Sequence, residues 1–219
     1  MNVLIACEES QEVCKAFRDK GHRAFSCDIQ ECSGGHPEWH ILGDVLPLLN
    51  GNCNFTLQNG DCDSIEGSWD LIIAHPPCTY LSNAGARWLC ADGKLNNSRY
   101  NKGLEGKDFF MAFYNANCER IAIENPVPSL LYGLPNYNQI IEPYMFGHNA
   151  TKKTCLWLKG LPPLKETNNV GRPEKEYFQK RDGTWRTNCW ALKIHGEDRA
   201  KNRSKTFSGI AAAMAEQWG

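Results

Sequence analysis

Cys78 has the sequence context of a nucleophile. It follows the pair Pro76-Pro77, which in turn follows the apolar run at 71–74. A deprotonated cysteine is a strong nucleophile when it is accessible, and a helix N-terminus or a nearby cation lowers its pKa. Because proline fixes φ and extends the chain before it, the two prolines hold the thiol out at the end of the strand. The alternative is a buried structural cysteine, which we expect for the other ten cysteines.

Acidic residues follow several other predicted strands. The residues at strand ends are Cys7-Glu8-Glu9, Asp28, Asp44, Pro76-Pro77-Cys78 and Glu124-Asn125. In an open α/β sheet, ligands bind outside the carboxyl ends of the strands, so these groups are expected to share one rim. Each acid taken alone is explained better by capping of the next helix. The set taken together favours a ligand site.

Two of these acids favour a nucleoside cofactor. An acid at the end of the second strand, Asp28, is the usual partner of ribose hydroxyls, and Asp44 at the end of the third could accept a hydrogen bond from an adenine amino group. The first loop, ACEESQEV, has no glycine, and its acids would repel a pyrophosphate. This pattern argues against NAD or ATP. It favours S-adenosylmethionine, whose sulfonium and amino groups are positive.

The elements that position these groups alternate in type along the chain. Apolar runs predict strands at 2–6, 22–29, 40–45, 69–75, 120–126 and 154–160. Helices are predicted at 10–21, with Ser10 as the cap, and over most of 84–118, after a polar loop at 90–103. Residues 50–67 predict a surface loop or a weakly formed helix. The fold class is therefore α/β, with a mostly parallel sheet flanked by helices.

The composition limits the class of protein. The net charge is −1, but residues 172–205 hold ten basic and five acidic residues. The 11 cysteines have no CxxC spacing, which indicates reduced thiols and a cytoplasmic location. The group Cys27, Cys32, His36 and His40 lacks the paired spacing of structural zinc, so no metal is expected. The start of the chain does not have the pattern of a signal peptide, and no apolar run reaches about 18 residues, so no membrane span is expected.

The strand-end motifs resemble those of the DNA cytosine-5 methyltransferase family. The resemblance rests on Pro76-Pro77-Cys78 and Glu124-Asn125, in this order and 46 residues apart, and extends over about 180 residues. It implies a Rossmann-like S-adenosylmethionine-dependent methyltransferase fold. It also implies that Cys78 attacks C6 of a cytosine flipped out of DNA, while Glu124 contacts N3 and the exocyclic amine.

The resemblance assigns roles to further residues. Those implied in cofactor binding are Cys7, Glu8, Glu9, Ser10, Asp28, Ile29, Asp44, Val45, Pro76, Ser208 and Gly209, with Phe207 beside them. Those implied in substrate binding are Pro77, Ser82, Asn125, Lys152, Lys153, Lys180, Arg181 and Arg186.

The chain departs from the family pattern in three places. The glycine-rich first loop is replaced by IACEES, lysines stand at 152 and 153 where the family has arginines, and only residues 161–203 replace a large target-recognition domain. We expect a catalytic core at 1–160, a small basic and aromatic insertion at 161–203, and a C-terminal helix at 204–219 that returns to the core. Two interpretations of the insertion are open, and they do not exclude each other. It contacts DNA, or it forms a hairpin that turns at Asp182-Gly183 and covers the sheet.

These features favour a compact methyltransferase of the kind expected in a phage or prophage, working in the cytoplasm of a bacterial host. It would act on DNA, either alone, as a homodimer or with a partner protein. One alternative is an enzyme that modifies C5 of a free pyrimidine nucleotide. A second is a non-catalytic relative that binds DNA, cofactor or a partner. A derivative of S-adenosylmethionine as donor stays open, and a flavin or nicotinamide oxidoreductase is disfavoured by the acidic first loop.

Overall fold

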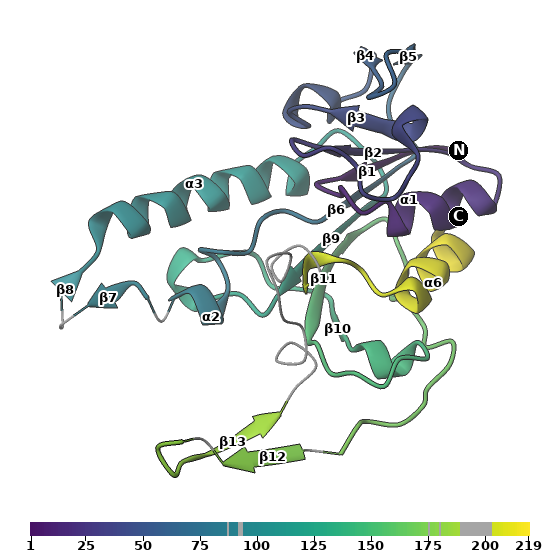
Figure 1. Ribbon diagram of the computed structural model, residues 1–219. Helices are drawn as coiled ribbons and strands as arrows, with labels where there is room; N and C mark the ends of the chain where they lie inside the picture. The colour runs from purple at the N-terminus through teal and green to yellow at the C-terminus, as the bar shows by residue number, and fades with distance from the viewer. Residues whose placement is uncertain (87, 92–93, 175, 180, 189–202) are drawn as a thin grey trace.

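A seven-stranded sheet forms the centre of the protein in the computed structural model (Figure 1). Its strands lie in the order β10-β11-β9-β6-β1-β2-β3. Their bounds are β1 Asn2–Ala6, β2 Arg23–Asp28, β3 His40–Leu42, β6 Leu71–Ala74, β9 Ile121–Pro126, β10 Gln139–Ile141 and β11 Thr154–Lys159. The structure describes every residue except 87, 92–93, 175, 180 and 189–202.

The sheet is mostly parallel, as predicted. Strands β3, β2, β1, β6 and β9 pair in parallel, whereas β11 is antiparallel to β9 and β10 is antiparallel to β11. The six predicted strands are confirmed, and β10 was not predicted. Parallel pairing brings the carboxyl ends of β1, β2, β3, β6 and β9 to one edge, which is where the site residues predicted at strand ends lie.

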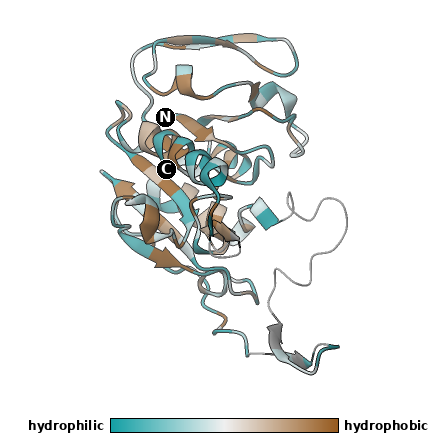
Figure 2. Cartoon of the chain, turned by 90° about the vertical axis from the view of Figure 1, so that its left-hand side faces the viewer, coloured by the Kyte–Doolittle hydropathy of each residue, from teal (hydrophilic) through white to brown (hydrophobic). Residues whose placement is uncertain are grey.

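Both faces of the sheet are buried. Side chains alternate between the two faces along each strand, so neighbouring residues of one strand pack on opposite sides. On β1, Leu4 packs with Phe110 and Phe113 of helix α3 (Asn97–Tyr114), while Val3 and Ile5 pack on the opposite face. Helices α1 (Glu12–Asp19) and α6 (Ser208–Trp218) cover that opposite face. The result is a three-layer α/β/α arrangement with hydrophobic residues gathered on the strands (Figure 2).

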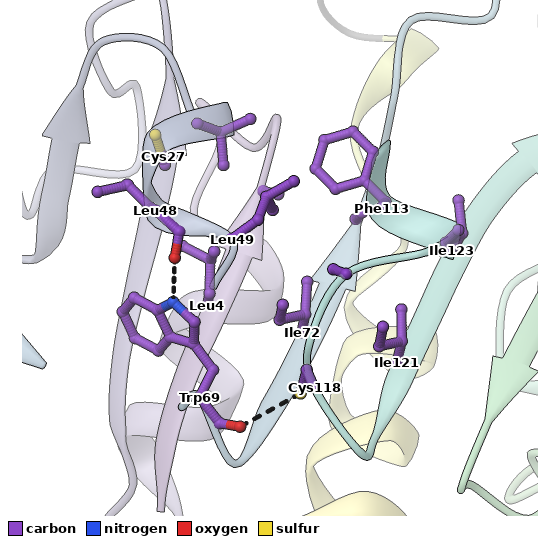
Figure 3. Packing of buried hydrophobic residues seen from close by; sticks show 14 of the residues in the cluster. Leu4, Cys27, Leu48, Leu49, Trp69, Ile72, Phe113, Cys118, Ile121 and Ile123 are labelled. Carbon is purple, nitrogen blue, oxygen red and sulfur yellow. Dashed lines mark hydrogen bonds between the residues drawn. The ribbon is translucent and has the colours of Figure 1, made fainter. Parts of the chain in front are cut away.

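Figure 3 shows the core on the α3 face of the sheet. Trp69 is fully buried there and donates its indole N–H to the carbonyl of Leu48 at 2.7 Å. The thiol of Cys118 lies 3.2 Å from the carbonyl oxygen of Trp69. These bonds satisfy polar groups inside the core. The prediction of buried structural cysteines is confirmed for Cys14, Cys27, Cys118 and Cys155, but it is wrong for Cys62 and Cys90, which are exposed.

Two regions differ from their predicted secondary structure. Residues 50–67, predicted as a loop or weak helix, contain a hairpin of β4 (Cys53–Thr56) and β5 (Cys62–Ile65). Residues 84–96, predicted as helix and then loop, contain α2 (Asn83–Ala86), β7 (Cys90–Ala91) and β8 (Lys94–Leu95). Helix α3 begins inside the predicted polar loop, because the Asn96 side chain accepts a hydrogen bond from the backbone N–H of Arg99 and caps it.

Short 3-10 helices complete the body. They are η1 (Pro37–Trp39), η2 (Leu46–Leu48), η3 (Leu130–Tyr132) and η4 (Pro143–Met145). None of the helices in the described ranges is both long enough and apolar enough to span a bilayer.

The basic insertion contains a separate hairpin of β12 (Glu176–Gln179) and β13 (Trp185–Asn188). Its turn at Asp182-Gly183 is confirmed, with Gly183 at φ +79° and the Asp182 carboxylate accepting from Thr184 N–H at 2.9 Å. The hairpin stands away from the seven-stranded sheet (Figure 1), so the expectation that it covers the sheet is wrong.

Candidate active site

The loop after β6 is fixed to the end of the neighbouring strand β9. Ala74 and Ile123 are register partners in these two strands. Beyond them, the side-chain amide of Asn125 donates to the carbonyl of Pro76 at 2.9 Å. Asn125 is only 1% exposed, so it ties the Pro-Pro corner in place instead of facing open solvent. This bond holds the Cys78 loop beside Glu124.

Helix α3 supports the same loop from the other side. The guanidinium of Arg99 donates to the carbonyls of Thr79 at 3.4 Å and Gly85 at 3.1 Å, and its carbon lies 4.9 Å from the ring centroid of Tyr80. A Cβ on Gly85 would lie 2.0 Å from the carbonyl oxygen of Thr79, so only glycine fits there. Cys78 therefore stands on a loop held at both ends.

Ser82, predicted to bind substrate, has a structural part in this loop. Its backbone N–H donates to the carbonyl of Cys78 at 3.0 Å, and its hydroxyl accepts from Gly85 N–H at 3.2 Å. The residue is buried. It closes the turn that carries Cys78.

Glu124 forms an ion pair with His75, a residue that the sequence analysis did not single out. His75 Nδ1 lies 3.2 Å from Glu124 Oε2, and the two side chains are 13% and 10% exposed. The hydroxyl of Thr206 also donates to Oε2, at 3.4 Å. Burial alone would raise the pKa of Glu124, but the bond with His75 and the positive charges of His75 and Lys152 hold it below its usual value.

The position of His75 in the sequence could have revealed it. His75 is a titratable residue at the end of the apolar run Leu71–Ala74, directly before the Pro-Pro corner. A charged group at the buried end of a strand requires a partner.

Glu8 is the second acid near His75, and it also caps helix α1. Its Oε1 accepts from Val13 N–H at 2.7 Å and its Oε2 from Cys14 N–H at 3.1 Å. The prediction that Ser10 caps this helix is wrong, because Gln11 occupies the cap position in a left-handed conformation and the capping bonds come from Glu8. Burial raises the pKa of Glu8, while the charge of His75 and the two N–H donors oppose that rise.

The Cys78 thiol is not activated in the free protein. Burial raises its pKa above the ordinary value, and the Glu124 charge adds to that rise. The charges of Lys152 and Arg203 act in the opposite direction but do not outweigh burial. Cys78 is therefore a thiol at neutral pH until a bound substrate or a proton acceptor changes its surroundings.

This arrangement predicts how Cys78 reacts with iodoacetamide. Because only the thiolate reacts, alkylation of Cys78 should require a higher pH than alkylation of free cysteine, and Lys152→Gln should move the Cys78 midpoint higher still. Peptide mass spectrometry after timed alkylation measures each cysteine separately. Lys153→Gln is the matched control, since Lys153 is exposed and its charge acts on Cys155. Equal midpoints for Cys78 in all three proteins would contradict the assigned role of Lys152.

A pocket of about 590 Å³ opens beside this site, at the carboxyl ends of β1, β2 and β3. It is lined by Cys7, Cys27, Asp28, Ile29, Gln30, Gly43, Asp44, Val45, Pro77, Tyr80, Lys102, Glu105, Gly106 and Phe109. Five residues predicted to bind the cofactor are in this set, as is Pro77. Helix α3 provides the opposite wall, with Lys102, Glu105, Gly106 and Phe109. The sequence analysis missed that wall because no motif indicates which helix lies over a strand end.

The two predicted cofactor acids face the same part of this pocket. Asp28 Oδ1 accepts from Gln30 N–H at 2.9 Å, and Asp44 Oδ1 accepts from Leu46 N–H at 3.0 Å, so local turns orient both carboxylates. Burial and then the charges of Asp28 and Asp44 raise the pKa of Cys7. Cys7 is therefore a neutral thiol between the two acids. It adopts φ 58°, a strained value for a residue other than glycine, at the end of β1.

The other predicted site residues are more dispersed. Glu9 and Ser10 are buried beyond the end of β1. Ser208 and Gly209 start helix α6, where Gly209 N–H donates to Nε2 of His148 at 2.9 Å, and neither lines the pocket. The remaining predicted residues are on the insertion: Arg181 is exposed at the hairpin turn, only the backbone of Arg186 is described, and Lys180 lies outside the described residues.

His40, considered above as a zinc ligand, has both ring nitrogens engaged. Nδ1 lies 2.8 Å from Ser26 Oγ, and Nε2 lies 2.9 Å from the carbonyl oxygen of Gln30. Within the described part of the chain, no three His, Cys, Asp or Glu side chains are grouped as metal ligands would be.

The fold and the site define an α/β protein with a nucleoside-sized pocket and a Cys–His–Glu group on adjacent strand ends. No protein-family model matches the chain, and no curated protein matches it. The assignment of function therefore depends on the chemistry of these residues.

Proposed function

We propose that the protein is an S-adenosylmethionine-dependent methyltransferase that acts on C5 of cytosine in DNA. One observation carries the proposal: the Cys78 thiol and the Glu124 carboxylate stand at the ends of the adjacent parallel strands β6 and β9, beside a pocket that contains Asp28 and Asp44. A nucleophile and an ionised acid next to a cofactor-sized pocket suit covalent catalysis on a pyrimidine ring.

The pocket residues suit S-adenosylmethionine. A volume of about 590 Å³ is in the range for cofactors. Asp28 and Asp44 could hold ribose hydroxyls and the adenine amino group, and apolar contacts could come from Ile29 and Phe109. Carboxylates at this position would repel a pyrophosphate, which disfavours a dinucleotide. Bound here, the cofactor would supply an electrophilic methyl group.

The chain's own residues would supply the covalent chemistry. Cys78 would first lose its thiol proton to solvent. Sγ would then form a bond to C6 of the base, and the C5–C6 π electrons would move to C5, which becomes nucleophilic. Glu124 holds the edge of the base during this step. After C5 has gained the methyl group, its proton would pass to solvent, the Sγ–C6 bond would break, and Cys78 would leave as the thiolate. Because C6 is inaccessible in a stacked duplex, the base must be extruded to reach Cys78.

The hairpin β12–β13 supports a polymer as the substrate. By register, Tyr177 and Trp185 point to the same face of the hairpin, and they are 60% and 68% exposed. Exposed aromatic rings stack on bases, and the exposed Arg181 lies at the adjacent turn. An enzyme that acts only on a free nucleotide would not need such a surface.

Replacing the pocket acids should weaken cofactor binding. Loss of a hydrogen bond to a charged group costs about 1.5–3 kcal/mol, so Asp28→Ala or Asp44→Ala should raise the Kd for S-adenosylmethionine by about 10- to 100-fold. Isothermal titration calorimetry measures this directly. Asp19→Ala, at an exposed position near the end of α1, is the control. An unchanged Kd in both pocket variants would show that S-adenosylmethionine does not bind at this site.

Covalent trapping tests the proposed function as a whole. Protein and S-adenosylmethionine are incubated with DNA containing 5-fluorocytosine, whose fluorine cannot leave as a proton does, and adducts are separated on a denaturing gel. We expect an adduct with DNA and none with 5-fluorodeoxycytidine monophosphate. An adduct with the nucleotide alone would favour the nucleotide-modifying alternative. Absence of both adducts, with cofactor binding intact, would contradict the proposal.

A further inference from the structure

Two loops border the pocket at the carboxyl ends of β1 and β2. The first loop, residues 7–11, follows β1, and the second, residues 29–36, follows β2. Cys7 of the first loop and Gln30 of the second both line the pocket. The loops are hydrogen-bonded to each other, since the backbone N–H of Ser33 donates to the carbonyl of Glu9 at 2.8 Å. The pocket wall after β2 is therefore held against the loop after β1.

The side chain of Gln11 connects the same two loops to β2. Its amide nitrogen donates to the carbonyl of His36 at 2.8 Å and to the hydroxyl of Ser26 at 3.2 Å, and its amide oxygen accepts from His36 N–H at 3.1 Å. Gln11 is fully buried and adopts φ 58°, a strained value for a residue other than glycine. A Cβ on Gly34 would lie 2.5 Å from Gln11 Cβ, so glycine at this position makes room for the glutamine.

His40 continues this chain of hydrogen bonds toward the pocket. Its fully buried ring lies between Ser26 Oγ, 2.8 Å from Nδ1, and the carbonyl oxygen of Gln30, 2.9 Å from Nε2. Burial lowers the pKa of His40, although the Gln30 carbonyl and the charges of Asp28 and Glu9 act in the opposite direction, so the ring is neutral at neutral pH. Because a carbonyl can only accept, Nε2 carries the proton and Ser26 donates its hydroxyl to Nδ1.

The chain ends at the turn that carries Asp28. The backbone N–H of Gln30 donates to Asp28 Oδ1 at 2.9 Å, and the carbonyl of the same residue accepts from His40. Gln30 is thus fixed by the histidine ring and in turn orients the carboxylate. A supporting group that is displaced by about 1 Å is enough to spoil the geometry of a binding site. The position of the Asp28 carboxylate therefore depends on His40.

We propose that His40 is a positioning residue for the cofactor: with Ser26 and Gln11 it fixes the Gln30 turn, and so holds the Asp28 carboxylate where it accepts from the ribose hydroxyls of S-adenosylmethionine. This inference rests on the proposed function, because it requires the cofactor in this pocket. His40 does not itself line the pocket, so it acts through Asp28. The network forms the ribose site before the cofactor arrives, and binding then needs no ordering of the second loop.

A double-mutant cycle between His40 and Asp28 tests this role. His40→Leu removes both ring nitrogens and keeps a buried side chain. In the protein that retains Asp28, we expect the Kd for S-adenosylmethionine to rise by about tenfold, the cost of one misplaced hydrogen bond to a charged group. In Asp28→Ala the same substitution should change the Kd by less than about twofold, because no carboxylate remains to be misplaced. Isothermal titration calorimetry measures the four proteins, and thermal unfolding checks that each is folded.

Two further variants complete the design. His40→Gln keeps an amide donor for the Gln30 carbonyl, so its Kd should return to within about threefold of the wild-type value. His22→Leu, at the turn before the amino end of β2, is the control and should bind like the wild type. Ser26→Ala removes only the hydroxyl and replaces His40→Leu in the cycle if that variant does not fold. Its expected rise is about threefold, and it should again disappear in Asp28→Ala.

The outcomes separate this inference from the proposed function. An equal rise in Kd with and without Asp28 would show that His40 only stabilises the fold, and it would overturn the inference. An unchanged Kd in His40→Leu would do the same. Failure of the wild type to bind S-adenosylmethionine would overturn the cofactor assignment, and this inference with it.

Discussion

Cys78→Ala should eliminate the covalent adduct with 5-fluorocytosine DNA and all detectable methyl transfer. The Sγ atom is the only group that the proposed chemistry offers for addition to C6, and without addition C5 stays too weak a nucleophile to be alkylated. The fold should survive, because the loop is held by Asn125 and Arg99 through backbone carbonyls and not through the thiol. Calorimetry should therefore show S-adenosylmethionine binding close to that of the wild type.

Cys62→Ala is the matched control for this experiment. Cys62 is an exposed cysteine on β5, in the hairpin away from the strand ends that carry the site. It should form the adduct at the wild-type rate. Persistence of the adduct in Cys78→Ala would assign the attack to another nucleophile and remove the central residue of the proposal.

The strands were predictable because burial on both faces leaves a continuous apolar run. The segments Leu71–Ala74 and Ile121–Ile123 have this property, and each ends at a polar or proline residue that marks the edge of the sheet. The β4–β5 hairpin was missed because its strands are mostly polar. The Asn59-Gly60 pair within it is nevertheless a recognised turn signal, and Gly60 adopts φ +96°.

The site was only half predictable, for a related reason. The sheet fixes the position of residues that follow its strands, such as Asp28 and Asp44. That these two residues line one pocket could therefore be expected. Phe109 and Glu105 reach the same pocket from a helix that crosses above it, and no local pattern fixes that crossing. Likewise, Glu8 was read as a cofactor ligand, although its carboxylate is engaged by the backbone of α1.

Glu124→Gln should reduce the rate of methyl transfer by about 10²- to 10³-fold, the usual cost of removing one preorganised hydrogen-bonding group that acts in the transition state. The substitution preserves shape, so Thr206 and the neighbouring strand need not move. It removes the negative charge that faces His75 and Lys152, and it replaces an obligate acceptor with an amide. Single-turnover methyl transfer from labelled cofactor to DNA measures the chemical step directly.

Cofactor affinity separates this effect from a general defect. Glu124 does not line the pocket that holds Asp28 and Asp44, so the Kd for S-adenosylmethionine in Glu124→Gln should match that of the wild type. Glu119→Gln changes an exposed residue just before the opposite end of β9 and should leave both rate and affinity unaltered. A wild-type rate in Glu124→Gln would show that the His75–Glu124 pair only stabilises the strand ends. The base edge would then have to be bound by other residues of the Cys78 loop.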